Sequence, residues 1–152
     1  MYRLERYNTH WMSAKDKYHD SAVTALVKDG WKITHDPLTL RYGRREVFVD
    51  LGAEQIFAAE RGTERIAVKV KSFIGDSEME DLRNALGQFV FYRNILEKVE
   101  SDRKLFLAIR ASVYESLFAE PIGQLFVENG QLQIIVFNEH TEEITKWLPP
   151  MN

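Results

Sequence analysis

A run of apolar residues that carries two lysines, 66–73 (IAVKVKSF), constrains the fold of this chain most strongly. Its length and its β-branched residues are typical of a buried strand. Because side chains alternate along a strand, Lys69 and Lys71 share one face with Ala67, and the β-branched residues share the other face. Two ammonium groups on one face require compensation. Solvent on an outer face would supply it, and so would a phosphate group in a binding site.

The composition predicts one globular domain, 13–152, preceded by a peripheral extension, 1–12. The chain has 152 residues, 45% of them hydrophobic and 28% charged, which is sufficient for one core. It has no cysteine, so disulfides and thiolate metal sites are excluded. Neither a signal peptide nor a membrane span is recognisable, and we expect a cytoplasmic protein without membrane contact. Since the net charge is −3, a surface that binds DNA has to be local.

Two segments give the clearest secondary-structure signals. The runs 55–61 and 64–73 flank Gly62-Thr63, which predicts a hairpin; a two-residue turn would place Ile56 opposite Lys69 and Glu54 opposite Lys71. Ser77 with Glu80 forms a capping box before about 22 residues of helical periodicity.

The remaining segments complete an alternation of helices and strands. A helix of about 16 residues is expected from a capping box at Ser13 to Asp29-Gly30. Further expectations are strands at 31–34, 46–50, 104–110 and 131–138, a loop at 35–43, and short helices within 112–128, broken near Pro121 and Gly123. This order predicts an α/β domain, bordering on α+β, with a central mixed sheet flanked by helices.

Three acidic residues near the lysine strand are candidates for binding a divalent cation. Asp50 ends an apolar strand and precedes Leu51-Gly52, where its carboxylate can project from the sheet. Glu54 and Glu60 belong to the neighbouring strand. Two of them also have a structural interpretation: a solvated turn for Asp50, and for Glu54 an ion pair with Lys71.

Two helical pairs extend the candidate site. Gln88 and Tyr92 are four residues apart, so an amide and a phenol lie on the same side of the long helix. His19 and Asp20 offer a ligand and an acid on the first helix. Taken alone, either pair is more typical of helix packing or surface decoration than of chemistry.

Together these segments resemble the PD-(D/E)XK nuclease superfamily in order and spacing. Within it, the chain is similar to the fdxN element excision controlling factors, the XisH-like proteins of cyanobacteria. The resemblance covers nearly all of 13–147. The segments that carry it are AKDKYHD (14–20), KDGWKITHDPLTL (28–40), VDLGAE (49–54), AAE (58–60), IAVKVKSFIG (66–75), DLRNALGQFVFYR (81–93) and EPIGQL (120–125).

The resemblance implies a restriction-endonuclease-like fold and a set of site residues. Asp50 corresponds to the metal-binding aspartate, Lys71 to the motif lysine, and Gln88 with Tyr92 to the helix motif. Lys69 stands where such proteins usually carry Glu. Exchanging −1 for +1 at about 4 Å from a divalent ion changes the energy by roughly 16 kcal/mol at an effective dielectric near 20, before screening. Ordinary Mg²⁺ affinity at that position is therefore not expected.

Three functions follow as hypotheses. The first is an excision controlling factor with an impaired metal site, which contacts DNA through Lys69 and Lys71 and acts with a small XisI-like partner, as the resemblance implies. The second is an active Mg²⁺- or Mn²⁺-dependent DNA endonuclease that uses Asp50, a relocated Glu54 or Glu60, and Lys71. The third is a protein-interaction module without DNA contact. A homo-oligomer is compatible with each of them.

Overall fold

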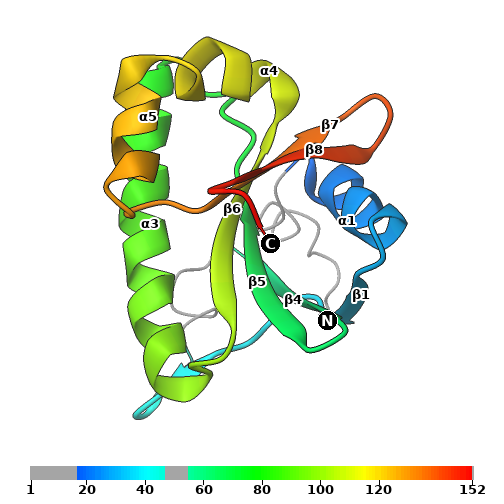
Figure 1. Ribbon diagram of the computed structural model, residues 1–152. Coiled ribbons are helices and arrows are strands. Elements are labelled where there is room, and N and C mark those ends of the chain that lie inside the picture. Colours follow the sequence, from blue (N-terminus) through cyan, green and yellow to red (C-terminus); the bar gives the residue numbers. More distant parts are fainter. Residues whose placement is uncertain (1–16, 47–54, 152) are drawn as a thin grey trace, which may run out of the picture.

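The computed structural model describes residues 17–46 and 55–151, and these form a central sheet with helices on both faces (Figure 1). The six strands of the sheet are β1 (Lys32–His35), β4 (Ile56–Arg61), β5 (Glu64–Val70), β6 (Lys104–Arg110), β7 (Ile134–Asn138) and β8 (Glu143–Leu148). A separate two-stranded ribbon consists of β2 (Arg41–Tyr42) and β3 (Arg45–Glu46). The helices are α1 (His19–Lys28), α3 (Glu78–Val99), α4 (Ala111–Val113), the π-helix η2 (Tyr114–Phe118) and α5 (Pro121–Glu128).

The strand order is β1-β4-β5-β6-β7-β8, and the sheet is mixed. The three central strands β5, β6 and β7 run parallel, whereas the outer pairings are antiparallel. Helix α3 forms the crossover between β5 and β6. The C-terminal ends of β5, β6 and β7 therefore lie together, and we call this the C-terminal end of the sheet. A mixed sheet flanked by helices confirms the predicted fold class.

The two faces of the sheet are covered by different helices. Phe89, Tyr92 and Leu96 of α3 pack with Ala67 and Leu107, and η2 contributes Leu117 and Phe118 to the same core. On the other face α1 packs Ala22, Ala25 and Leu26 against Phe57, Val68 and Ile135. Figure 1 shows α3 and α5 on one side of the sheet and α1 on the other. Within the described residues, no helix is long and apolar enough to cross a membrane.

The hairpin and the long helix confirm the sequence-based predictions. Gly62-Thr63 forms the turn, and Ile56 pairs with Lys69. Gly62 has φ of +61°, a conformation that favours glycine. Ser77 caps α3, because its Oγ accepts a hydrogen bond from the Glu80 amide at 3.2 Å.

Other predictions were wrong in detail. The first helix begins at His19 rather than at Ser13, since Lys17 and Tyr18 form a turn. The expected loop 35–43 contains β2, and the expected strand to Phe73 ends at Val70. Strand β8 was missed. The predicted extension 1–12, positions 13–16 of the predicted first helix and most of the expected strand 46–50 lie outside the described residues.

The segment after β6 folds into short helical pieces, as predicted, but the break comes before Pro121. Pro121 begins α5, where its missing amide hydrogen costs nothing. Gly123 lies inside α5 and does not break it. A Cβ at Gly123 would lie within 3 Å of the Leu117 carbonyl carbon. This position therefore requires glycine because α5 packs closely on η2.

Candidate functional site

The C-terminal end of the sheet gathers the residues that follow the parallel strands. Lys71 and Ser72 come directly after β5, Arg110 ends β6, and Glu139 follows β7. Tyr18 precedes α1 and contacts the same group through Arg110. Ligand sites of α/β sheets commonly lie at this end of the strands. We therefore take this end as the candidate functional site.

Lys69 lies inside the protein rather than on a surface. It is 2% exposed, and its Nζ donates a hydrogen bond to the Val70 carbonyl oxygen at 2.9 Å. Its neighbours across the sheet are Ile56 and Leu107, both in the core beneath α3. The prediction of two phosphate-facing lysines on one strand face is therefore wrong for Lys69. An ammonium buried in this way acts as an internal charge.

Lys71 is the more accessible of the two lysines. It follows the end of β5, and its side chain is half-buried. The Lys71 amide donates to the Ala108 carbonyl at 3.1 Å, which ties the segment to β6. Within residues 17–46 and 55–151, no hydrogen bond or ion pair of the Lys71 ammonium is present. Its charge is thus available to an anionic ligand.

Arg110 joins several elements beside Lys71. Its Nη2 donates to the Ser72 carbonyl oxygen at 2.7 Å, and its Nη1 donates to Glu139 Oε2 at 3.4 Å. The guanidinium carbon lies 4.4 Å from the centre of the Tyr18 ring. Lys17 approaches the same ring, with Nζ at 5.5 Å. Arg110 therefore links the end of β5, the residue after β7 and the residue before α1.

Gln88 and Tyr92 lie on α3 as the helix motif requires. Tyr92 is 1% exposed and belongs to the core between α3 and the sheet. Gln88 is half-buried, and its Oε1 is a buried atom with no hydrogen-bond partner among the described residues. An unpaired buried acceptor is costly, and such atoms often mark functional sites. The catalytic role assigned to this pair stays a prediction.

His19 and Asp20 differ in their surroundings. His19 is 3% exposed, and its Nε2 lies 2.8 Å from Asp36 Oδ2. Its ring meets the Phe57 ring edge to face at 5.3 Å. Asp20 is exposed at the first turn of α1. His19 thus fixes the start of α1 against the sheet and the loop that contains Asp36.

The three acidic candidates for metal binding are not brought together in the described structure. Asp50 and Glu54 lie outside the described residues. Glu60 pairs with Arg65, and Ile56 with Lys69, so Glu60 is four positions away along β4, about 13 Å at the usual rise of a strand. Within residues 17–46 and 55–151, no three His, Asp or Glu side chains are grouped as a metal site needs. Glu60 as a metal ligand stays a prediction without geometric support.

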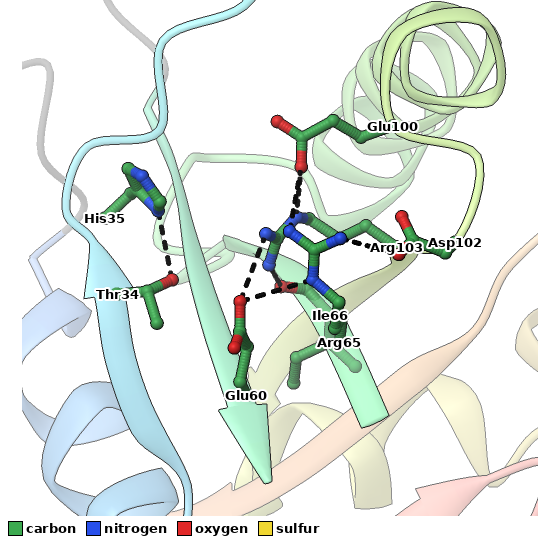
Figure 2. Close-up of polar contacts among 8 residues, drawn as sticks. All are labelled: Thr34, His35, Glu60, Arg65, Ile66, Glu100, Asp102 and Arg103. Atoms are coloured by element: carbon green, nitrogen blue, oxygen red, sulfur yellow. Dashed lines mark hydrogen bonds and ion pairs between the residues drawn. The ribbon is translucent and has the colours of Figure 1, made fainter. Parts of the chain in front are cut away.

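The opposite end of the sheet, where β5 and β6 begin, contains a network of charged pairs, which we call the arginine network (Figure 2). Arg65 donates to Glu60 at 3.2 Å and to Asp102 at 2.6 Å. Arg103, whose side chain is fully buried, donates to Glu100 at 2.8 Å and to the Ile66 carbonyl at 3.0 Å. Figure 2 shows both guanidinium groups between the carboxylates of Glu60 and Glu100.

Hydrogen bonding in this network shifts two pKa values. The hydrogen bond from Arg65 lowers the pKa of Asp102, and the hydrogen bonds to Asp102 and Glu60 raise the pKa of Arg65. Each shift favours the charged form. A cavity of about 310 Å³ opens nearby, between the Arg65–Asp102 pair and the segment 149–151. The Arg65 and Asp102 side chains on its rim are already paired with each other, and the cavity lies away from Lys71, so we assign it no role.

Sequence reasoning missed Arg110, Arg103 and Tyr18. Arg110 had a recognisable signal, because it is the charged last residue of an otherwise apolar run, 105–109, at the C-terminal end of a parallel strand. Arg103 had a weaker signal, an acid three residues earlier at the end of α3. Tyr18 had none, since its contact partner is 92 positions away.

Comparisons with known proteins agree with the overall fold. The family model described as XisH protein matches residues 12–145. The crystal structure of an XisH family protein from Nostoc punctiforme PCC 73102 is 34% identical, with TM-score 0.78, over 88% of this chain and 99% of that chain. An fdxN element excision controlling factor protein from Anabaena variabilis is 38% identical, with TM-score 0.77, over 86% and 97%. No curated protein matches the chain.

Proposed function

This chain belongs to the XisH family, and we propose that it is a DNA-contacting factor in programmed element excision whose nuclease-like scaffold lacks a working metal site. The name of the Anabaena variabilis relative, a factor that controls excision of the fdxN element, supports the process. The proposal for this chain rests on its own residues at the C-terminal end of the sheet.

The observation that carries the proposal is the environment of Lys69. A nuclease core of the kind that the chain resembles places a carboxylate at this position to bind Mg²⁺ or Mn²⁺. Here the position holds an ammonium that is 2% exposed and donates to the Val70 carbonyl. An internal positive charge repels a divalent cation. The residues described at this position do not fit a metal ion, and we derive no cleavage step through one.

Lys71 is the proposed contact to DNA. It is half-buried at the end of β5, and Lys17 and Arg110 lie at the same end of the sheet. Cations that neutralise phosphates release counterions, so binding weakens as salt rises and depends little on sequence. The role of Lys69 in DNA binding is then indirect, through the field of its buried charge.

The proposal is tested by measuring DNA affinity across salt concentrations for Lys71→Gln. Losing one phosphate contact should lower the slope of log affinity against log salt by about 0.9. Lys146→Gln is the matched control, because Lys146 is exposed on β8 and already lies over the Tyr114 ring. An unchanged slope for Lys71→Gln would contradict the proposed contact.

A cleavage assay separates this proposal from an active nuclease. We expect no cleavage by the wild-type protein with Mg²⁺ or Mn²⁺, and metal-dependent cleavage only after Lys69→Glu restores the acid. Wild-type cleavage that Asp50→Ala abolishes would instead establish the nuclease. Lys69→Met, which keeps the length of the side chain without charge, controls for repacking.

The same proposal includes a small XisI-like partner, on the strength of the family resemblance. Co-expression and co-purification test it directly. A stable complex that retards no DNA, together with a free protein that binds none, would favour a protein-interaction module and overturn the DNA-contacting role.

A further inference from the structure

Arg110 connects three segments at the C-terminal end of the sheet. It donates to the Ser72 carbonyl at the end of β5, to Glu139 after β7, and it stacks on Tyr18 before α1. The side chain is 15% exposed, as is that of Glu139. A planar guanidinium suits this task, because its donors point in fixed directions while its face packs on a ring.

Strand β5 ends at Val70, and the hydrogen bond from the Lys71 amide to the Ala108 carbonyl ties the segment 71–73 that follows to β6. Ser72 is buried, and Phe73 adopts φ of +55°, a left-handed conformation that is uncommon outside glycine. Such a residue persists only where its surroundings impose it. Phe73 packs edge to face on Phe118 at 5.9 Å, and Ser72 is fixed through its carbonyl by Arg110.

We infer that Arg110 is a positioning residue that holds the segment 71–73 so that the Lys71 ammonium is presented at the C-terminal end of the sheet. This inference rests on the proposed function and deepens it by naming what orients the phosphate contact. Within the described residues Arg110 Nε is buried without a hydrogen-bond partner.

The test compares Arg110→Met, Lys71→Gln and the double variant, with Arg93→Met as the matched control. Arg93 also donates to two loop carbonyls, those of Gly130 and Gln131, and lies over the ring of Phe89, but it belongs to α3. Both positions therefore lose hydrogen bonds to main-chain carbonyls and a ring contact when Met replaces Arg, and Arg110 also loses its ion pair with Glu139.

If Arg110 positions Lys71, Arg110→Met lowers the salt slope of DNA binding as much as Lys71→Gln does. The slope of the double variant is then no lower than that of either single variant. Such non-additivity is expected of residues that act through one contact. A slope that falls twice as far in the double variant means that Arg110 contacts phosphate itself and overturns the inference. Equal loss in Arg93→Met also overturns it, because general destabilisation then explains the effect.

Amide hydrogen exchange gives a readout that needs no DNA. The Lys71 amide is bonded to Ala108, so Arg110→Met should speed its exchange about tenfold or more and leave Val68 unchanged. Arg110→Lys should restore the Ser72 contact only in part. If wild-type protein binds no DNA, the proposed function fails, and exchange at Lys71 alone decides the positioning role. Unchanged exchange there rejects it.

Discussion

The two ends of β5 hold their cations in opposite ways. At the N-terminal end, Arg65 and the buried Arg103 lie among the carboxylates of Glu60, Glu100 and Asp102. At the C-terminal end, Lys69 donates to a main-chain carbonyl, and no ion pair of Lys71 is present in the described part of the chain. A cation paired with carboxylates fixes structure, whereas Lys71, which has no ion pair among the described residues, projects its field outward.

Arg103→Ala, at the N-terminal end of β5, should have the largest effect on the free energy of unfolding. It removes the buried guanidinium from Glu60 and Glu100 and leaves the Ile66 carbonyl without this donor. We expect a loss of about 3 to 5 kcal/mol in the free energy of unfolding. Urea denaturation measures it, with an unchanged m value showing that the fold is retained. A loss within 1 kcal/mol would show that the network contributes little.

Lys69→Glu tests whether the buried position near the C-terminal end of β5 accommodates an ammonium better than a carboxylate. Without divalent cations, a carboxylate at this buried position should cost about 2 to 4 kcal/mol. If the Kd of the variant for Mn²⁺ is about 100-fold below the Mn²⁺ concentration, millimolar Mn²⁺ should restore about 2 to 3 kcal/mol of the free energy of unfolding. Thermal unfolding with EDTA and with Mn²⁺ measures both. An equal Mn²⁺ response of the wild-type protein would contradict the impaired site.

Acid should loosen the N-terminal end of β5 selectively. The folded pKa of Asp102 lies below its ordinary 3.8, so its contribution to stability is complete above that value. The contribution is lost as the pH falls through the folded pKa. As the pH falls from 5 to 2, the protection factor for amide exchange at Ile66 should therefore fall before that at Lys71. Asp102→Asn should remove this difference, and a simultaneous fall of both protection factors in the wild-type protein would count against it.

Lys71→Gln should have the smallest effect on stability. The side chain is half-buried, and no ion pair of it is present in the described residues, so the free energy of unfolding should change by less than about 0.5 kcal/mol. The same variant is expected to weaken DNA binding. A destabilisation above 1 kcal/mol would show instead that Lys71 is part of the structure.

Local signals predicted the hairpin and α3 because each is specified by neighbouring residues. Gly62-Thr63 with flanking alternation set the register of Ile56 and Lys69, and Ser77 marked the start of the helix. Strand β8 was missed because it forms only by pairing with β7, and Thr145 and Lys146 give it no apolar run. Strands β2 and β3 are too short to leave a pattern.

The candidate site was less predictable, since its properties depend on distant contacts. Alternation gave the face on which Lys69 lies, but its burial depends on α3 covering that face. The charge of Lys69 favoured an exposed side chain, and that interpretation was wrong. Arg110 and Tyr18 meet only because the residue before α1 lies beside the last residue of β6, and no spacing in the sequence predicts this contact.

The parallel pairing of β5 with β6 also has a consequence for the order of folding. The hairpin of β4 and β5 closes through two residues, so Glu60 and Arg65 can meet within microseconds. Ile66 and Lys104, which pair across β5 and β6, are separated by the whole of α3, and closing so long a loop is entropically slower. We therefore expect the ion pair between Glu60 and Arg103 to form only when β6 pairs with β5, as a late step of folding.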